Sequence, residues 1–102
     1  MNHVPFLPRF LPLIRARRKW ATTRTRKLGE VGDILDTDTG AIQLTRVERL
    51  SLDHVAETHH EAEGCESPQG FIDVWREIHP RAGWTPKAKK WYHEFTYLGD
   101  DA

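Results

Sequence analysis

The sequence predicts a single α+β domain over residues 1–102, and three observations support that class. The chain is long enough for one modest hydrophobic core but not for two. A hydrophobic fraction of 38% beside 29% charged residues is typical of a folded globular protein rather than a disordered one. Segments that alternate apolar and polar residues, as strands do, are interspersed with segments that have helical spacing.

The N-terminal third predicts a short edge strand, a helix and a second strand. Residues 4–6 are suited to a strand at a sheet edge. Residues 8–17 place apolar side chains on one side of a helix, which begins at Pro8 or, because proline disrupts a helix interior, at Pro12. Residues 19–26 are rich in threonine and alternate small with long polar side chains, which favours a strand.

The middle of the chain predicts two strands joined by a turn. We expect the strands at residues 33–35 and 41–50, with the segment "DTDTG" turning the chain between them. The apolar register of the second strand changes between Leu44 and Val47, which predicts a β-bulge.

The C-terminal half predicts two helices and a final strand. Residues 52–64 have a helical pattern that Gly64 closes. A second helix begins after the capping residue Ser67 and ends at Pro80. Residues 89–98 alternate, with apolar character on both faces, which predicts a strand in the centre of the sheet.

Charge is distributed unevenly along this neutral chain. Residues 1–27 carry eight Lys or Arg and no acid, whereas residues 28–102 carry seven cations and fifteen acids. A basic segment on a neutral protein attracts phosphate locally, so nucleic acid is a candidate partner.

The sequence indicates no membrane segment and no oxidising compartment. Three prolines and Arg9 interrupt the apolar N-terminus, so it is unsuited to a spanning helix. The single cysteine, Cys65, excludes an intrachain disulfide and a paired-cysteine zinc site, and we expect it to fill space. We therefore expect a cytoplasmic protein with no membrane partner; its oligomeric state is left open.

Four short motifs occur in order along the chain. The first is "RRKWATTR" at 17–24. The others are "VGD" at 31–33, "AEGCES" at 62–67 followed by a helix with Phe71 and Trp75, and an aromatic strand ending near Phe95. Together they resemble the motifs of the ASCH domain family of the PUA-like superfamily, whose signature GxKxxTxR is similar to the first of them. The resemblance covers residues 4–97, and it implies a PUA-like β-barrel with flanking α-helices.

The resemblance also implies a function. ASCH domains bind RNA or a nucleoside, and one branch of small members consists of acetylcytidine amidohydrolases with a catalytic lysine, threonine and glutamate. By motif these are Lys19, Thr22 and Glu63, and Arg24 is the signature arginine. Chemically, a threonine nucleophile needs a nearby base, and a lysine with a pKa lowered by burial can serve.

We therefore expect a basic cleft that binds RNA or a modified nucleoside, with removal of an acyl group from cytidine as the candidate reaction. The binding residues expected beside the catalytic set are Arg17, Arg18, Trp20, Arg24 and Arg26. A non-catalytic RNA-binding module and a single-strand ribonuclease are the alternatives. Without the resemblance, a solvated basic face is the simplest interpretation of the tract, and Trp20 fits partial burial as well as base stacking.

Strand geometry restricts how the candidate residues converge. Thr22 and Arg24 share one face of a strand, whereas Lys19 points to the other face unless it lies in a loop or bulge before the strand. A glycine two residues before the lysine permits such a turn in the family, but here that residue is Arg17. A positive φ at a non-glycine residue costs on the order of 1 kcal/mol.

Other residues have simpler interpretations. His59 and Glu63 share a helix face, but no zinc-protease motif or second ligand cluster accompanies them, so we expect no metal and no cofactor. From the residues alone, Glu63 ranks no higher than its neighbouring glutamates. The side chains of Trp75, Trp91 and Phe95 are expected in the core.

Overall fold

The computed structural model describes residues 3–99, and it confirms the α+β class. None of the helices in this part of the chain is long and apolar enough to cross a bilayer. The elements, in chain order, are the 3₁₀ helix η1 (Pro8–Phe10), α1 (Leu11–Arg15), β1 (Ala21–Arg24), β2 (Ile34–Thr37), β3 (Gly40–Ser51), α2 (Leu52–Thr58), α3 (Pro68–Ile78) and β4 (Lys89–Gly99).

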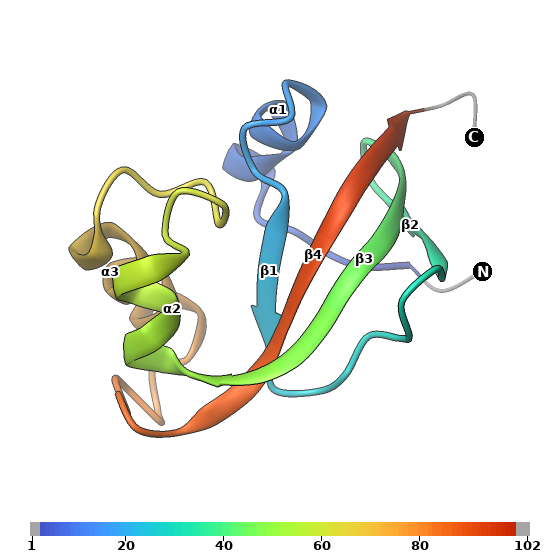
Figure 1. Ribbon diagram of the computed structural model, residues 1–102. Coiled ribbons are helices and arrows are strands. Elements are labelled where there is room, and N and C mark those ends of the chain that lie inside the picture. The colour runs from blue at the N-terminus through green and yellow to red at the C-terminus, as the bar shows by residue number, and fades with distance from the viewer. Residues whose placement is uncertain (1–2, 100–102) are drawn as a thin grey trace.

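The strands form one antiparallel sheet in the order β1-β4-β3-β2, so β4 lies inside the sheet as its sequence predicts (Figure 1). The predicted closed barrel is wrong for the described residues, because β1 and β2 are both edges and do not pair with each other. β1 has only four residues, and helices and the N-terminal segment lie beside it instead of another strand.

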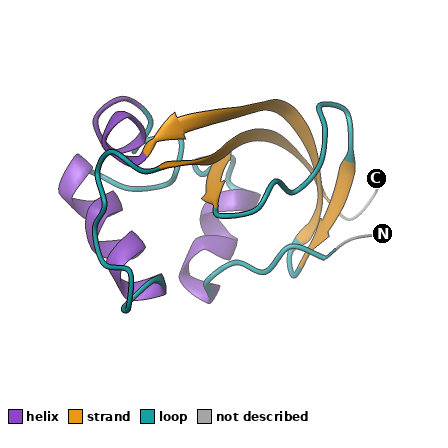
Figure 2. Ribbon diagram, turned by 90° about the horizontal axis from the view of Figure 1, so that it is seen from below, coloured by secondary structure: helices purple, strands orange, loops and turns teal. Residues whose placement is uncertain are grey.

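The hydrophobic core has two clusters on opposite faces of the sheet. Tyr92 packs with Leu52 and Val55 of α2 and with Trp75 of α3. Three residues further along β4, Phe95 points to the other face. There it packs with the N-terminal segment, α1, β2 and β3, through Val4, Ile14, Leu35, Ile42 and Leu44. Figure 1 accordingly shows α2 and α3 together and α1 apart from them, and Figure 2 shows the same separation from below.

Local signals predict the elements of the second half well. The hydroxyl of Ser67 accepts a hydrogen bond from the backbone N–H of Gly70 at 3.0 Å, which confirms the predicted cap of α3. The register of β3 shifts between Leu44 and Arg46, which confirms the predicted bulge. The helix predicted over 52–64 ends earlier, at Thr58, and turns continue to Gly64.

The N-terminal predictions are less accurate. Residues 4–6 are not a strand; the segment only touches the sheet, where the N–H of Val4 donates to the carbonyl of Asp36 at 2.7 Å. The helix predicted over 8–17 divides into η1 and α1. The predicted strand over 19–26 is shorter and begins only at Ala21.

Arg17 has the strained backbone conformation that the glycine position of the motif predicts. Its φ is 60°, and it is the only non-glycine residue with positive φ among the described residues. It follows Ala16, the C-terminal cap of α1, where a left-handed residue lets the next N–H groups reach back. The N–H groups of Arg18 and Lys19 both donate to the carbonyl of Leu13, at 2.8 and 3.1 Å.

We expect Arg17→Gly to raise the free energy of unfolding by up to about 1 kcal/mol, because glycine adopts positive φ without steric cost. The matched control Arg18→Gly, at a neighbouring residue without positive φ, should lower it by about 0.5–1 kcal/mol through chain entropy. Urea unfolding of both variants measures the difference. Equal destabilisation by the two substitutions would show that Arg17 is not strained.

Candidate functional site

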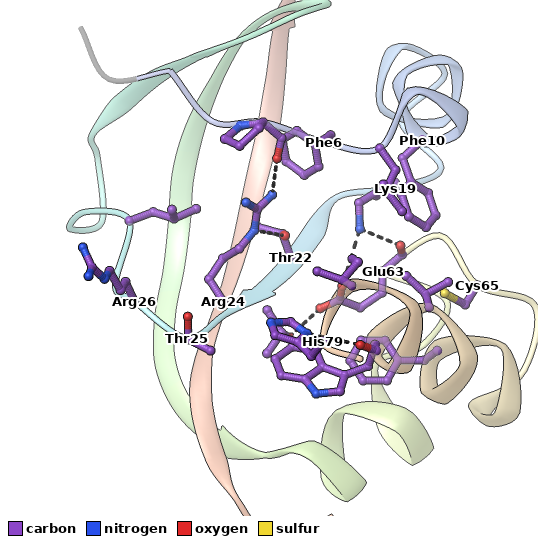
Figure 3. A pocket seen from close by; sticks show the side chains of 18 of the residues that line it. Phe6, Phe10, Lys19, Thr22, Arg24, Thr25, Arg26, Glu63, Cys65 and His79 are labelled. Carbon is purple, nitrogen blue, oxygen red and sulfur yellow. Dashed lines mark hydrogen bonds and ion pairs between the residues drawn. The ribbon is translucent and has the colours of Figure 1, made fainter. Parts of the chain in front are cut away.

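A cavity of about 520 Å³ lies at the free edge of β1 (Figure 3). One wall is the N-terminal segment with Phe6 and Phe10, and the opposite wall is α3 with Phe71 and Trp75 and the residue that follows it, His79. Polar groups of β1 and of the turn after α2 lie between these aromatic walls. Volumes of roughly 300–1,000 Å³ with a few placed polar groups are typical of small-molecule sites.

The turn after α2 is held against the edge of β1 by backbone hydrogen bonds. The N–H groups of Trp20 and Ala21 both donate to the carbonyl of Ala62, at 2.8 and 3.0 Å. Gly64 then turns the chain with a φ of 87°, and a Cβ there would lie only 3.1 Å from the Cβ of Lys19. The glycine therefore permits the close approach that brings Glu63 beside Lys19.

Lys19 and Glu63 form a buried ion pair. Each residue is only 4% exposed. The Lys19 ammonium donates to the carbonyls of Glu63 and Ala21, at 2.7 and 2.9 Å, and to Oε1 of Glu63 at 3.4 Å. Lys19 lies in the loop before β1, as convergence with Thr22 requires. Burial and the contact with Lys19 distinguish Glu63 from its neighbours Glu61 and Glu66, which are exposed.

Burial lowers the pKa of the Lys19 ammonium from its ordinary value, and the charge of Glu63 opposes that shift. The Phe10 ring, whose centroid lies 4.6 Å from the ammonium nitrogen, covers the charge on another side. Removal of water is therefore the main influence on the protonation of this lysine.

Thr22 and Thr23 present their hydroxyls to different partners. The hydroxyl of Thr22 accepts a hydrogen bond from Nε of Arg24 at 2.9 Å, so these two side chains share a face as predicted. Thr23, on the other face, donates to Oε2 of Glu63 at 2.7 Å. The cation of Arg24 favours negative charge on the Thr22 oxygen, whereas Thr23 fixes the carboxylate.

The predicted binding residues do not all reach this cavity. Arg24 and Arg26 line it. Arg17 and Trp20 instead line a second hollow of about 300 Å³, and Trp20 is 44% exposed, so it is not in the core. Arg18 is exposed and lines neither hollow. The single predicted cleft is therefore two hollows separated by the loop that carries Lys19.

Sequence patterns do not identify several residues of the cavity. Phe6 and Phe10 are far from the motifs, and only the fold brings them to Lys19 and Arg24. The ring of His79 stacks on Trp75 with 4.0 Å between centroids, and no motif marks it. Among the cavity residues that the motifs do not mark, Thr23 could have been found from the sequence, because it is a threonine next to Thr22.

His93 connects β1 to the loop that follows it. Its ring lies on the inner strand β4, fully buried, with Nδ1 3.2 Å from the carbonyl of Thr22. Nε2 accepts a hydrogen bond from the N–H of Leu28 at 3.0 Å. Nδ1 therefore carries the proton and donates to Thr22, so the neutral imidazole holds the backbone at the candidate nucleophile.

The histidines in and directly after α2 are not part of a cluster of metal-ligating side chains among the described residues. Among residues 3–99, no group of three His, Cys, Asp or Glu side chains has metal-binding spacing. The His59 ring stacks on Tyr92 with 4.5 Å between centroids. Cys65 lines the cavity, and burial raises the pKa of its thiol, which disfavours the reactive thiolate.

The fold and the cavity thus define a small α+β protein with a cavity of small-molecule size at the edge of an antiparallel sheet. The chain has the fold of solved ASCH domains. The ASCH domain from Lactobacillus crispatus shares 16% identity, with a TM-score of 0.71 over 96% of this chain and 79% of that chain. A mutant ASCH protein from Zymomonas mobilis shares 14% identity, with a TM-score of 0.67 over 92% of this chain and 67% of that chain.

A protein from Enterococcus faecalis that is assigned to family DUF984 has the same fold. It shares 17% identity, with a TM-score of 0.74 over 97% of this chain and 81% of that chain. No protein-family model and no curated protein matches the sequence. At these identities the structural likeness shows the fold but not the chemistry of the site.

We expect Lys19→Met and Glu63→Gln each to lower the free energy of unfolding by about 3–5 kcal/mol, because each leaves a buried partner uncompensated. The double variant Lys19→Met with Glu63→Gln should lose much less than the sum of the two. Urea unfolding of the four proteins gives the coupling energy. Additive losses would mean that the two side chains do not stabilise each other.

We expect stability to fall as the pH drops below about 6.5, in part through His93. Burial lowers the pKa of His93 from its ordinary 6.5, so the unfolded chain takes up the proton first. His93→Phe should reduce the pH dependence and cost about 1–3 kcal/mol, because two backbone groups lose their partner. The pKa of His59 is also lowered mainly by burial, so His59→Phe is the variant for comparison. It should remove only the part of the pH dependence that does not come from His93.

Unfolding in urea between pH 5 and pH 8 measures both effects. An unchanged pH dependence in His93→Phe would mean that His93 is not the neutral donor and acceptor described above.

Proposed function

We propose that the protein binds a nucleoside in the β1-edge cavity and hydrolyses an amide that links an acyl group to a cytosine base. The observation that carries this proposal is the convergence of a threonine hydroxyl, a buried lysine–glutamate pair and an arginine between aromatic walls. Aromatic walls suit a planar base, and the few polar groups between them suit its edges.

The motif and the geometry both support these residues. The tract resembles that of the ASCH acetylcytidine amidohydrolases, whose lysine, threonine and glutamate correspond to Lys19, Thr22 and Glu63. All three line the same cavity, although Glu63 is distant in sequence. This supports the assignment of roles, which the fold alone does not carry.

In the proposed reaction, Oγ of Thr22 attacks the amide carbonyl carbon and its proton passes to the neutral amine of Lys19. The carbonyl electron pair moves to oxygen and returns as the C–N bond breaks, and Lys19 gives its proton to the departing cytosine amine. Water then hydrolyses the acyl ester of Thr22, which releases the acid and restores the hydroxyl. The lowered pKa of Lys19 favours the neutral amine that the first step needs.

The hydrogen bonds of Lys19 also define what that step requires. As an ammonium it uses all three protons on Ala21 and Glu63. The neutral amine keeps two protons, so the longest contact, at 3.4 Å to Oε1 of Glu63, is the one to be given up. Thr23 still holds the other carboxylate oxygen at that stage.

The Lys19 ammonium, with all three protons hydrogen-bonded, also supports a second candidate, a non-catalytic RNA-binding module. In that case Lys19 is a structural cation, and Arg24 and Arg26 contact phosphate or base groups. Turnover separates the two candidates directly, because a binding module forms a complex and no product.

The test is incubation of the purified protein with N-acetylcytidine, with chromatographic detection of cytidine and acetate. We expect turnover in the wild type and a loss of at least about 10³-fold in Thr22→Val, which removes the hydroxyl at nearly constant shape. The matched variant Thr23→Val should retain more activity, because it only loosens Glu63.

Absence of cytidine from the wild-type reaction, with binding of the nucleoside intact, would favour the binding module. Full activity in Thr22→Val with loss in Thr23→Val would move the nucleophile to Thr23.

A further inference from the structure

A row of cationic and aromatic side chains crosses the sheet, starting from Arg24 of the cavity lining. Trp91 of β4 pairs in register with Arg24 of β1 on one side and with Arg49 of β3 on the other. Paired residues of neighbouring strands point to the same face. Lys27, which follows β1, adds a further cation, with its ammonium 5.1 Å from the centroid of the Trp91 ring.

No sequence pattern indicates this row, and the expectation that Trp91 lies in the core is wrong. The residue is instead half-buried, and the guanidinium of Arg49 lies 5.5 Å from its ring centroid. Lys27 and Arg49 are both exposed. A ring holds a cation in place without neutralising it, so the charge of Arg49 stays available to an anion.

The charge balance around Trp91 is positive. Lys27 has an ion pair with Glu30, whereas the side-chain hydrogen bond of Arg49 goes to a neutral group, the carbonyl of Lys89. The exposed Lys89 lies two residues before Trp91 on the same strand and therefore on the same face. Such a surface suits a polyanion.

This surface is continuous with the mouth of the cavity. Arg24, Thr25 and Arg26 line the cavity, and the next residue is Lys27. Figure 3 shows Arg24, Thr25 and Arg26 together on one side of the pocket. Arg24 thus belongs both to the cavity lining and to the row around Trp91.

We propose that Lys27 and Arg49, held on the Trp91 ring, bind the phosphates of a single-stranded polynucleotide whose base occupies the β1-edge cavity. The cavity then accepts a nucleoside that is part of a strand as well as a free nucleoside. This inference rests on the proposed function, because it needs the cavity to accept a nucleoside. A single strand is specified because a base inside the cavity is unstacked and unpaired.

The test compares two probes, free N-acetylcytidine and a short fluorescein-labelled oligocytidylate RNA, across a series of potassium chloride concentrations. We expect the double variant Lys27→Gln with Arg49→Gln to weaken RNA binding about tenfold or more. The slope of log affinity against log salt should become shallower by about 0.7 for each phosphate that the variant no longer neutralises. Binding and turnover of the free nucleoside should stay unchanged, because neither residue lines the cavity.

The matched control is Arg15→Gln, which removes an exposed arginine from α1. The segment after α1 meets the far end of β4, where the guanidinium of Arg17 lies over Tyr97. We expect RNA affinity to change less than about twofold in this control. An equal loss of affinity in the control and the double variant, or none in the double variant, would overturn the proposed surface.

The two probes separate this inference from the proposed function. Turnover of the nucleoside without RNA binding by the wild type would overturn the surface and leave the cavity function intact. RNA binding that depends on Lys27 and Arg49, without nucleoside binding or turnover, would support the phosphate contacts but refute the cavity as a nucleoside site.

Discussion

The buried contact between Lys19 and Glu63 determines the geometry of the site. Removing two charges from water is costly, and the cost is offset here because the ammonium has three acceptors and the carboxylate a second donor in Thr23. These bonds join the loop before β1 to the turn after α2, two segments that the sheet itself does not connect. The edge of β1 is thereby placed opposite α3, and the space left between them is the cavity.

Backbone contacts beside this ion pair support β1 at the open edge of the sheet. β1 would otherwise present its outer N–H groups to solvent, but the carbonyl of Ala62 accepts from both Trp20 and Ala21. His93 holds the carbonyl of Thr22 from the inner strand. The edge strand is therefore fixed from both sides, and its hydroxyls are preorganised beside a cavity that a closing strand would fill.

Many features of the fold can be predicted from local sequence. Features that depend on which distant segments become neighbours cannot. The cap at Ser67, the bulge after Leu44 and the inner position of β4 follow from residue types and spacing, and the structure has all three. The shared face of Thr22 and Arg24 is also predictable. The row around Trp91 is not, because it depends on which strands become neighbours, and an alternating aromatic strand looks equally suited to burial on either face.

Arg17 shows how one strained residue divides a basic tract. A left-handed residue at the end of α1 reverses the chain sharply, which sends Lys19 inward to Glu63 while the guanidinium of Arg17 lies over the ring of Tyr97 at 5.5 Å. In an unbroken strand these two cations, two residues apart, would point to the same face. The strain thus assigns neighbouring charges to different tasks, one buried in the site and one exposed. The charge density of the tract alone carries no such distinction.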